Sequence, residues 1–461
     1  MSKNIGFFAV LMFIIGAIDS IRNLPATALF GASLIFFFIF SAITFLIPTA
    51  LVSAELAARN PNEGGIYFWV KNVFGKKMGF LAVWLQWINT MIWYPTMLSF
   101  IASTAVYLID PKLAQDKYYL ISIILLVFWA LTYINLKGIQ ISAELNSFCA
   151  MIGTVIPMVL IIVLGCIWAA ASKPMQIHFS VNDIFPTFGH SQNWISLTAI
   201  ITTFLGMELT AVHVNNIKNA QKIYPKAVTV GAFIVLITLL FGSLAIAVVL
   251  PEKDINLVDG TLQAFGAFFK AYHLTWMVPV MTILILIGSF GGMINWIISP
   301  AKGLLQAAQD DFLPHFLAKK NEKGVAKNLL ILQAVLVSLV CLAFLLMPSV
   351  NGSYWLLTDL STQIYVLMYM LMFLAAIVTR YKFKSQTPAF MIPGGNVGMW
   401  IISVLGLVGC CIAFVVGFFP PDGINVGGVL HYEKIFTMGI IGMVLPVLLF
   451  YFYQSFAVKK G

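Results

Sequence analysis

Long runs of hydrophobic residues, separated by short polar stretches, extend along the whole chain. Many of these runs reach the ~20 residues that an α-helix needs to cross a ~30 Å hydrocarbon core. The short alternating strands of an outer-membrane barrel do not occur in the pattern. Hydropathy and turn residues therefore predict twelve membrane-spanning helices, at residues 5–29, 32–55, 77–107, 118–136, 143–171, 192–215, 228–250, 274–305, 328–347, 354–380, 397–419 and 432–456.

The composition agrees with an all-α polytopic membrane protein. Of the 461 residues, 61% are hydrophobic and 9% are charged, whereas soluble domains carry about 25% charged residues. No A-x-A-like cleavage site follows the first run, so we expect it to be retained as a helix rather than removed as a signal peptide. The expected surroundings are a lipid bilayer, and the oligomeric state stays open.

The positive charges indicate how the chain is oriented. With the N-terminus inside, the cytoplasmic segments hold 19 of the Lys and Arg residues and the outer loops hold six. This bias predicts a multi-pass protein of the inner (plasma) membrane with both termini in the cytoplasm. It also accounts for the net charge of +9 without a nucleic-acid partner. The six outer residues are Lys112, Lys117, Lys173, Lys253, Lys270 and Lys434.

Neither a metal nor another cofactor is expected, and neither is enzymatic activity. The five cysteines lie in apolar runs without metal-ligand spacing. No H-E-x-x-H motif or nucleophile–base pair appears. A channel would need rings of charge or a continuous polar pore, but the midplane polar residues cluster in two spans instead.

These two spans are interrupted by glycine and charged residues. The first reads FIIGAIDSIRNLP (13–25), and the sixth contains TTFLGMELTAVHVNN (202–216). A charge at such depth costs ~3 kcal/mol or more and usually faces a cavity or a partner. Because the sixth span comes five helices after the first, the two run in opposite directions, which is typical of an inverted repeat with paired broken helices. The alternative is a proline-kinked helix in which Asp19 and Arg22 pair with each other.

Several longer motifs accompany these breaks. They are AELAARNPNEGGIYFWVKNVFG (54–75), FLGMELTAVHVNNIKNAQKIYPKA (204–227), GSFGGMINWIISPAKGLLQAAQDDFLPHFLAKKNEKGVA (288–326), TPAFMIPGG (387–395) and GFFPPDGIN (417–425). Together they resemble the amino acid–polyamine–organocation (APC) transporter superfamily, most closely its bacterial glutamate/γ-aminobutyrate antiporter branch. The resemblance covers nearly the whole chain.

The resemblance implies a single transmembrane domain with a LeuT-type fold. Repeat one covers about 5–171, repeat two about 192–380, and the peripheral helices 11 and 12 about 397–456. The implied activity is alternating-access transport of a small-molecule amino acid substrate, commonly by exchange. A proton-coupled uptake permease is the alternative.

The resemblance also implies where the substrate binds. An amino acid zwitterion needs donors for its carboxylate and acceptors for its ammonium group, and broken helices supply both from backbone atoms. On this interpretation, residues 17–21 and 204–208 hold the substrate, and Ser20 adds a hydroxyl. The substrate-binding residues expected from the two breaks are Ala17, Ile18, Asp19, Ser20, Arg22, Phe204, Gly206 and Glu208.

Glu208 matches the acid of the family's F-x-G-x-E segment, where it couples substrate binding to helix movement. A buried carboxyl there can also hold or release a proton. The alternative is a structural carboxylate that caps an unwound helix.

Asp19 and Arg22 have two open interpretations. We hypothesise that Asp19 contacts the substrate ammonium group or the surroundings of Glu208. Arg22 then either binds a substrate carboxylate or neutralises Asp19 and Glu208. The matching position in the glutamate/γ-aminobutyrate branch is commonly aromatic, so Arg22 is a departure.

Aromatic residues complete the expected chamber. Trp296 matches an aromatic that lines the family's substrate chamber, Trp93 and Tyr94 are candidates for its wall, and Tyr365 is a candidate gate. Packing or interfacial anchoring is the alternative for each. Gly292 stands where the branch carries a glutamate, which puts glutamate/γ-aminobutyrate exchange in doubt.

Overall fold

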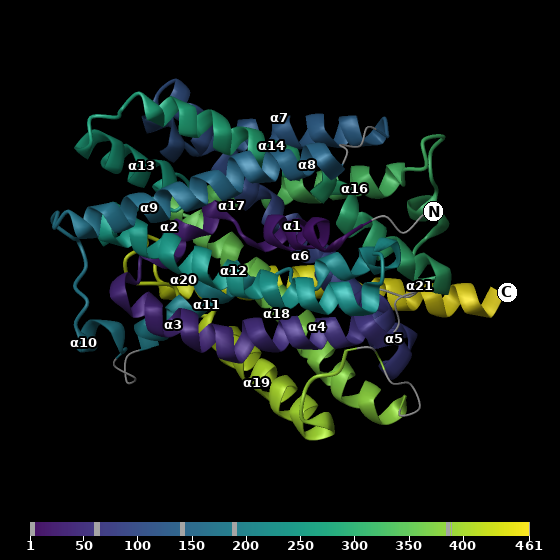
Figure 1. The fold of residues 1–461 in the computed structure, drawn as a ribbon. Coiled ribbons are helices and arrows are strands. Elements are labelled where there is room, and N and C mark those ends of the chain that lie inside the picture. The colour runs from purple at the N-terminus through teal and green to yellow at the C-terminus, as the bar shows by residue number, and fades with distance from the viewer. Residues whose placement is uncertain are drawn as a thin grey trace.

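The chain folds into a bundle of long helices in a computed structural model, which describes residues 5–59, 65–138, 143–186, 191–383, 388 and 390–460 (Figure 1). Within these residues no β-structure forms beyond an isolated bridge between Ile5 and Ile217. Twelve helical segments among them are long and apolar enough to cross a membrane. The prediction of an all-α protein with twelve spans is therefore confirmed.

The first half of the chain contains ten α-helices. They are α1 (Phe7–Ile18), α2 (Leu24–Ala28), α3 (Leu34–Ser41), α4 (Ile47–Arg59), α5 (Ile66–Phe74), α6 (Lys76–Ala105), α7 (Lys117–Leu136), α8 (Ala143–Ala150), α9 (Ile156–Ala170) and α10 (Val181–Ile184). Short 3₁₀ or π segments join or extend them: η1 (Ile21–Asn23), η2 (Gly31–Ser33), η3 (Ala42–Leu46), η4 (Val106–Leu108), η5 (Pro111–Gln115) and η6 (Met151–Val155).

The second half contains eleven more. They are α11 (Ser191–Phe204), α12 (Ala220–Val249), α13 (Gly260–Ala271), α14 (Met277–Leu305), α15 (His315–Ala318), α16 (Lys327–Val340), α17 (Ala343–Leu346), α18 (Val350–Lys382), α19 (Gly395–Val416), α20 (Val429–Val444) and α21 (Val447–Lys460). The 3₁₀ segments here are η7 (Leu209–Asn216), η8 (Glu252–Asp254) and η9 (Gln306–Asp310).

Two spans begin four or more residues earlier than the hydropathy pattern predicts. The seventh begins at Ala220 rather than at residue 228, because Asn219 takes a left-handed conformation (φ 50°) directly before it. The tenth begins at Val350 rather than at residue 354, because the Ser349 hydroxyl accepts a hydrogen bond from the Gly352 amide at 2.9 Å. A side-chain cap thus sets the start of the tenth span, whereas the seventh begins after a left-handed residue that makes no side-chain capping hydrogen bond.

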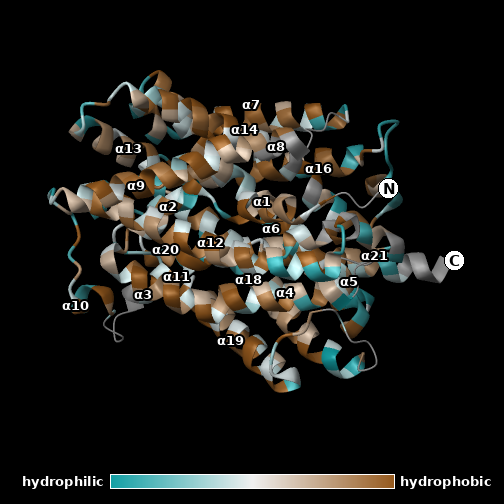
Figure 2. Cartoon of the chain, in the orientation of Figure 1, coloured by the Kyte–Doolittle hydropathy of each residue, from teal (hydrophilic) through white to brown (hydrophobic). Residues whose placement is uncertain are grey.

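The broken helices lie in the middle of the bundle. In Figure 1, α1 occupies the centre, and α7 and α19 lie at opposite edges. Figure 2 shows hydrophobic residues along the length of the helices and hydrophilic ones gathered at the two ends of the bundle. Helices pack closely where small residues meet: a Cβ on Gly153 would lie 2.2 Å from the Cα atom of Gly288. Such contacts are typical of association between membrane helices.

Both predicted interruptions are present. Helix α1 ends at Ile18, and Asp19 is extended (φ −73°, ψ 94°) before η1 resumes the span. Helix α11 ends at Phe204, and Gly206 has φ +102°, a conformation that glycine adopts without strain. A Cβ on Gly206 would lie 3.8 Å from the carbonyl oxygen of Ala17. The two breaks therefore meet.

Helix α13, which the hydropathy pattern did not predict, covers the first break. Its Thr261 hydroxyl donates to the carbonyl of Ile21 at 2.9 Å. A Cβ on Gly260 would lie 2.8 Å from Cβ of Pro25, so the helix begins in direct contact with the span. The loop between the seventh and eighth spans is thus fixed against the broken segment.

Candidate functional site

Glu208 lies directly after the second break and is 1% exposed. Its Oε1 accepts hydrogen bonds from Gln86 Nε2 at 2.9 Å and from the Tyr365 hydroxyl at 2.5 Å. Its Oε2 accepts a hydrogen bond from the Tyr369 hydroxyl. The three donors are neutral and come from α6 and α18, so the carboxyl joins the broken span to two continuous ones.

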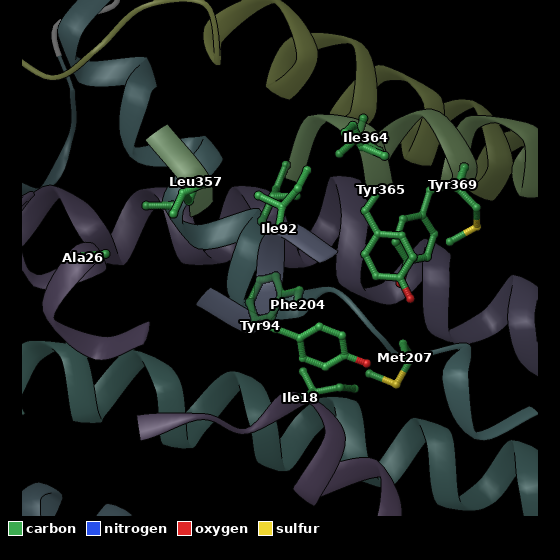
Figure 3. Close-up of a cluster of buried hydrophobic side chains, with 14 of the residues drawn as sticks. Ile18, Ala26, Ile92, Tyr94, Phe204, Met207, Leu357, Ile364, Tyr365 and Tyr369 are labelled. Carbon is green, nitrogen blue, oxygen red and sulfur yellow. The ribbon is translucent and has the colours of Figure 1, made fainter. Parts of the chain in front are cut away.

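Tyr369 also contacts the backbone of the break. Its hydroxyl accepts a hydrogen bond from the Gly206 amide at 2.8 Å and donates to Glu208. Figure 3 shows the rings of Tyr365 and Tyr369 side by side on α18, directed toward Phe204 and Met207. One hydroxyl thus satisfies both a main-chain donor and a carboxylate oxygen of the interrupted segment.

Asp19, at the first break, is 4% exposed. Its Oδ2 accepts a hydrogen bond from the Thr238 hydroxyl of α12 at 3.1 Å. Its Oδ1 is buried without a hydrogen-bond partner among the described residues. A buried carboxylate oxygen without a partner can accept a hydrogen bond from a donor such as an ammonium group.

Arg22 is 2% exposed, and its hydrogen-bond partners lie on α6 and α18. Its guanidinium donates to the hydroxyl of Thr96 at 2.6 Å and to that of Tyr354 at 3.3 Å. It also lies 5.6 Å from the centroid of the Trp93 ring, within range of a cation–π interaction. Its Nε is buried without a partner in the part of the chain that the structure describes.

Neither buried charge pairs with the other. The ion pairs within 4.0 Å among the described residues involve Glu55 and Asp310, and none includes Asp19, Arg22 or Glu208. The extended backbone at Asp19 and Ser20 accounts for this, because residues three apart then no longer share a face as they do on a helix.

The aromatic candidates lie together. The rings of Trp93 and Trp296 are 5.1 Å apart, and the Tyr94 hydroxyl donates to the backbone carbonyl of Trp296 at 2.9 Å. Trp93 connects this group to Arg22. Tyr365 lies instead beside Glu208, so the four aromatic candidates divide between the two breaks. Gly292 lies outside the described side chains.

The remaining candidates line the junction of the breaks. Ala17 and Ser20 are half-buried, Ile18 is buried, and Phe204 packs edge-on against Phe38 with the ring centroids 5.7 Å apart. The Ser20 side chain makes no capping hydrogen bond to the 3₁₀ turn that follows it. All the predicted substrate-binding residues therefore belong to the described part of the chain.

The charged pairs lie away from this junction. Glu55 binds Arg380 at 2.6 Å and Arg59 at 3.0 Å. Asp310 binds Lys71 and also Lys76, the latter at 2.8 Å. Burial alone would raise the pKa of Asp310, but the donors Lys71, Lys76 and Tyr67 lower it to about 2. Asp310 is thus an anion at neutral pH that joins η9 to α5 and α6.

Five hydrogen-bond partners of the buried charged residues were not predicted from the sequence: Gln86, Thr96, Thr238, Tyr354 and Tyr369. Tyr369 could have been found, because it follows Tyr365 by four residues and so shares its face of α18. The other four come from spans far away in sequence, and hydropathy gives no signal for them. No group of three metal-ligating side chains occurs within the residues that the structure describes.

Comparisons with known proteins agree with this architecture. A family model described as "Amino acid permease" matches residues 5–446. The chain is 42% identical over 439 residues to an uncharacterised transporter of Legionella pneumophila, covering 95% of this chain and 94% of that protein. It is 27% identical over 454 residues to a glutamate/γ-aminobutyrate antiporter of Lactococcus lactis, covering 97% and 90%. A cadaverine/lysine antiporter of Escherichia coli is 24% identical over 424 residues, covering 90% and 89%.

Proposed function

The chain belongs to the amino acid permease family and is a multi-pass amino acid transporter; we propose that it exchanges amino acids by alternating access. Exchange is supported by the relatives in Lactococcus lactis and Escherichia coli, which are named antiporters. The plasma membrane, with both termini in the cytoplasm, is the proposed location, from the distribution of Lys and Arg.

One observation carries the proposal: two opposite charges, Asp19 and Arg22, are buried at the junction of two broken helices and have only neutral partners. Burying an unpaired charge is costly. A zwitterion in this junction offsets that cost at both places, because its ammonium group reaches Oδ1 of Asp19 and its carboxylate reaches Arg22. An amino acid is such a zwitterion.

The neutral surroundings of Arg22 favour the carboxylate-binding hypothesis over the salt-bridge hypothesis. Neutralising Asp19 or Glu208 would require an ion pair, and none within 4.0 Å includes these residues in the described structure. A guanidinium offers a bidentate fork to a carboxylate. Thr96 and Tyr354 hold that fork in place from two different spans.

Glu208 supplies the coupling between binding and movement. Its partners Gln86 and Tyr365 lie on α6 and α18, so any displacement of the second break changes these hydrogen bonds. The same observation supports the second candidate function, proton-coupled uptake. A carboxyl surrounded by neutral donors is able to carry a proton in one conformation and lose it in the other.

Counterflow in proteoliposomes tests the proposal. Liposomes loaded with unlabelled glutamate, γ-aminobutyrate, lysine or leucine are diluted into the same amino acid in labelled form. Exchange predicts uptake only where an amino acid is present on both sides of the membrane. Uptake into unloaded liposomes, driven by a pH gradient alone, would support proton-coupled uptake instead. Inactivity toward every amino acid tried would contradict the transport proposal.

A further inference from the structure

A patch of exposed lysines lies where α7 ends and α16 begins. None of these lysines forms an ion pair within 4.0 Å among the described residues. Glu322 is the only acidic residue between the first and last lysine of the loop, so the patch keeps a large positive charge. The members of this lysine patch are Lys137 just after α7, Lys319, Lys320 and Lys323 in the loop before α16, and Lys327, the first residue of α16.

Hydrogen bonds hold the loop before α16 against the end of α7. The Asn321 side chain donates to the Leu136 carbonyl at 2.9 Å. Its Oδ1 accepts hydrogen bonds from the amides of Lys323 and Val325, each at 3.0 Å. A Cβ on Gly138 would lie 3.0 Å from Cβ of Lys323, so the loop touches the residue that follows Lys137. The lysines of the loop and of α7 therefore belong to one surface.

An exposed aromatic face of α7 continues from the patch into the span. Trp129, Tyr133 and Lys137 follow one another at intervals of four residues and so lie on one face. Both aromatic side chains are exposed. The Lys137 ammonium group lies 4.7 Å from the centroid of the Tyr133 ring. Aromatic and basic side chains in this order are typical of a helix that crosses the boundary between lipid and water.

Helix α16 has the same arrangement beside it. Lys327, Ile331 and Val335 also follow one another at intervals of four residues, and Lys327 and Val335 are exposed. The Trp129 indole of α7 donates to the Ser338 hydroxyl of α16 at 3.1 Å, so the exposed faces of the two helices adjoin. Two neighbouring helices thus offer lysines at one end and apolar surface along their length.

The patch lies at the end of the bundle that carries both chain termini (Figure 1). Figure 2 shows hydrophilic residues at this end and hydrophobic ones along α7 and α16. The proposed orientation, with both termini in the cytoplasm, turns the lysines toward the inner leaflet. Anionic headgroups of that leaflet attract lysines near the membrane surface.

We propose that the lysine patch, together with the exposed faces of α7 and α16, binds an anionic phospholipid. Its headgroup phosphate contacts Lys137, Lys323 and Lys327, and its acyl chains lie along Tyr133 and Val335. The surface complements both the charge and the apolar chains of such a lipid, whereas a soluble anion matches the charge alone. Only the choice of leaflet rests on the proposed orientation. The residues proposed for exchange take no part in this site.

Phospholipid binding to the purified full-length protein in detergent tests the proposal. The protein is incubated with dioleoylphosphatidylglycerol or with zwitterionic dioleoylphosphatidylcholine, and the lipid that stays bound is measured after gel filtration. We expect tighter binding of phosphatidylglycerol. Combined Lys137→Gln, Lys323→Gln and Lys327→Gln should raise the phosphatidylglycerol concentration needed for half-saturation by about tenfold or more. Inorganic phosphate at the same concentration as the lipid should not displace it.

A charge-matched variant separates this site from general attraction. Combined Lys218→Gln, Lys222→Gln and Lys226→Gln removes three exposed lysines near the same end of the bundle, where the Lys218 amide donates to the Ile5 carbonyl. It should leave phosphatidylglycerol binding unchanged. Arginine in place of the three patch lysines keeps the charge and should preserve binding.

Three results would overturn the lipid site: equal binding of the two lipids, equal weakening by the two glutamine variants, or displacement of the lipid by inorganic phosphate. Thermal unfolding of each variant shows that its fold is intact. Counterflow of labelled amino acids, measured separately, keeps the exchange proposal distinct. Absent counterflow with selective lipid binding would overturn exchange and leave the lipid site standing.

Discussion

The Gly206 amide donates a hydrogen bond to the Tyr369 hydroxyl at 2.8 Å, so a side chain of α18 is bound to the main chain of the second break. The same hydroxyl donates to Glu208. A backbone donor that is expected to face the substrate is therefore occupied by a tyrosine. Any movement of the second break on substrate binding therefore disturbs this contact with α18.

Tyr369→Phe should slow counterflow by about tenfold or more, because it leaves a buried amide and a carboxylate oxygen without a partner, at ~1–3 kcal/mol each. Counterflow in proteoliposomes measures the loss. Tyr119→Phe is the control, since the half-buried Tyr119 hydroxyl donates only to the Ala102 carbonyl, at 3.2 Å. Equal rates in the two variants would show that Tyr369 does not take part in transport.

Gly206→Ala should destabilise the protein and impair transport. At φ +102° an alanine is strained by ~1–3 kcal/mol, and its Cβ would lie 3.2 Å from a methyl group of Leu209. Thermal unfolding in detergent, together with counterflow, measures both effects. Gly442→Ala is the matched control, because a Cβ there meets no atom within 4 Å. An unfolding midpoint as high as that of Gly442→Ala would contradict the strained backbone.

Arg22→Ala and Arg22→Lys should both raise the KM for substrate by about tenfold to a hundredfold. A hydrogen bond to a charged group contributes ~1.5–3 kcal/mol, and losing that free energy weakens binding by this factor. Lysine keeps the charge but loses the planar fork. Uptake at varied substrate concentrations gives KM and the maximal rate separately. If lysine restored KM fully, charge alone would matter, and bidentate binding of a carboxylate would be excluded.

Glu208→Gln should remove the pH dependence of transport while leaving counterflow measurable. Glutamine keeps an acceptor oxygen for one of the tyrosines but has no ionisable proton. Counterflow rates from pH 5 to pH 8, compared with the wild type, make the measurement. A pH profile that persists unchanged in Glu208→Gln would assign proton binding to another group.

Asp310 should stabilise the protein at neutral pH and lose that contribution only in strong acid. Its pKa is about 2 in the folded protein against an ordinary value of 3.8. Because folding lowers this pKa, the stabilisation is fully present well above pH 3.8 and is lost as the pH falls through this window. The difference in unfolding midpoint between wild type and Asp310→Asn should stay constant from about pH 8 to pH 5 and narrow below about pH 4. A difference that varies between pH 5 and pH 8 would contradict the ion pairs.

The spans and both breaks could be predicted from the sequence, because burial in lipid demands long apolar runs and because glycine and charged residues disrupt them. Helix α13 could not be predicted from hydropathy, because its short sequence, with Gly260 and Thr261, lacks the length and hydropathy of a span. The boundaries of the two repeats, at about 5–171 and 192–380, stay a prediction.

The partners of the charged residues could not be predicted, because they depend on how distant helices are rotated against one another. Asp19 contacts Thr238 on α12, whereas Arg22 contacts Thr96 on α6, although the two charged residues are only three positions apart in the sequence. Sequence spacing suggested a mutual ion pair as one alternative. The extended backbone between them places the two side chains against different spans.

The most direct test of the central claim is whether an amino acid substrate protects the junction of the breaks from chemical modification. Ser20→Cys is introduced after replacement of Cys149, Cys166, Cys341, Cys410 and Cys411, and its alkylation is followed with and without saturating substrate. The half-buried position of Ser20 at the first break predicts that an exchanged amino acid slows its alkylation, while a cysteine in place of Ser338 on α16 reacts equally fast in both conditions. An alkylation rate at residue 20 that substrate leaves unchanged would contradict binding at the junction of the broken helices.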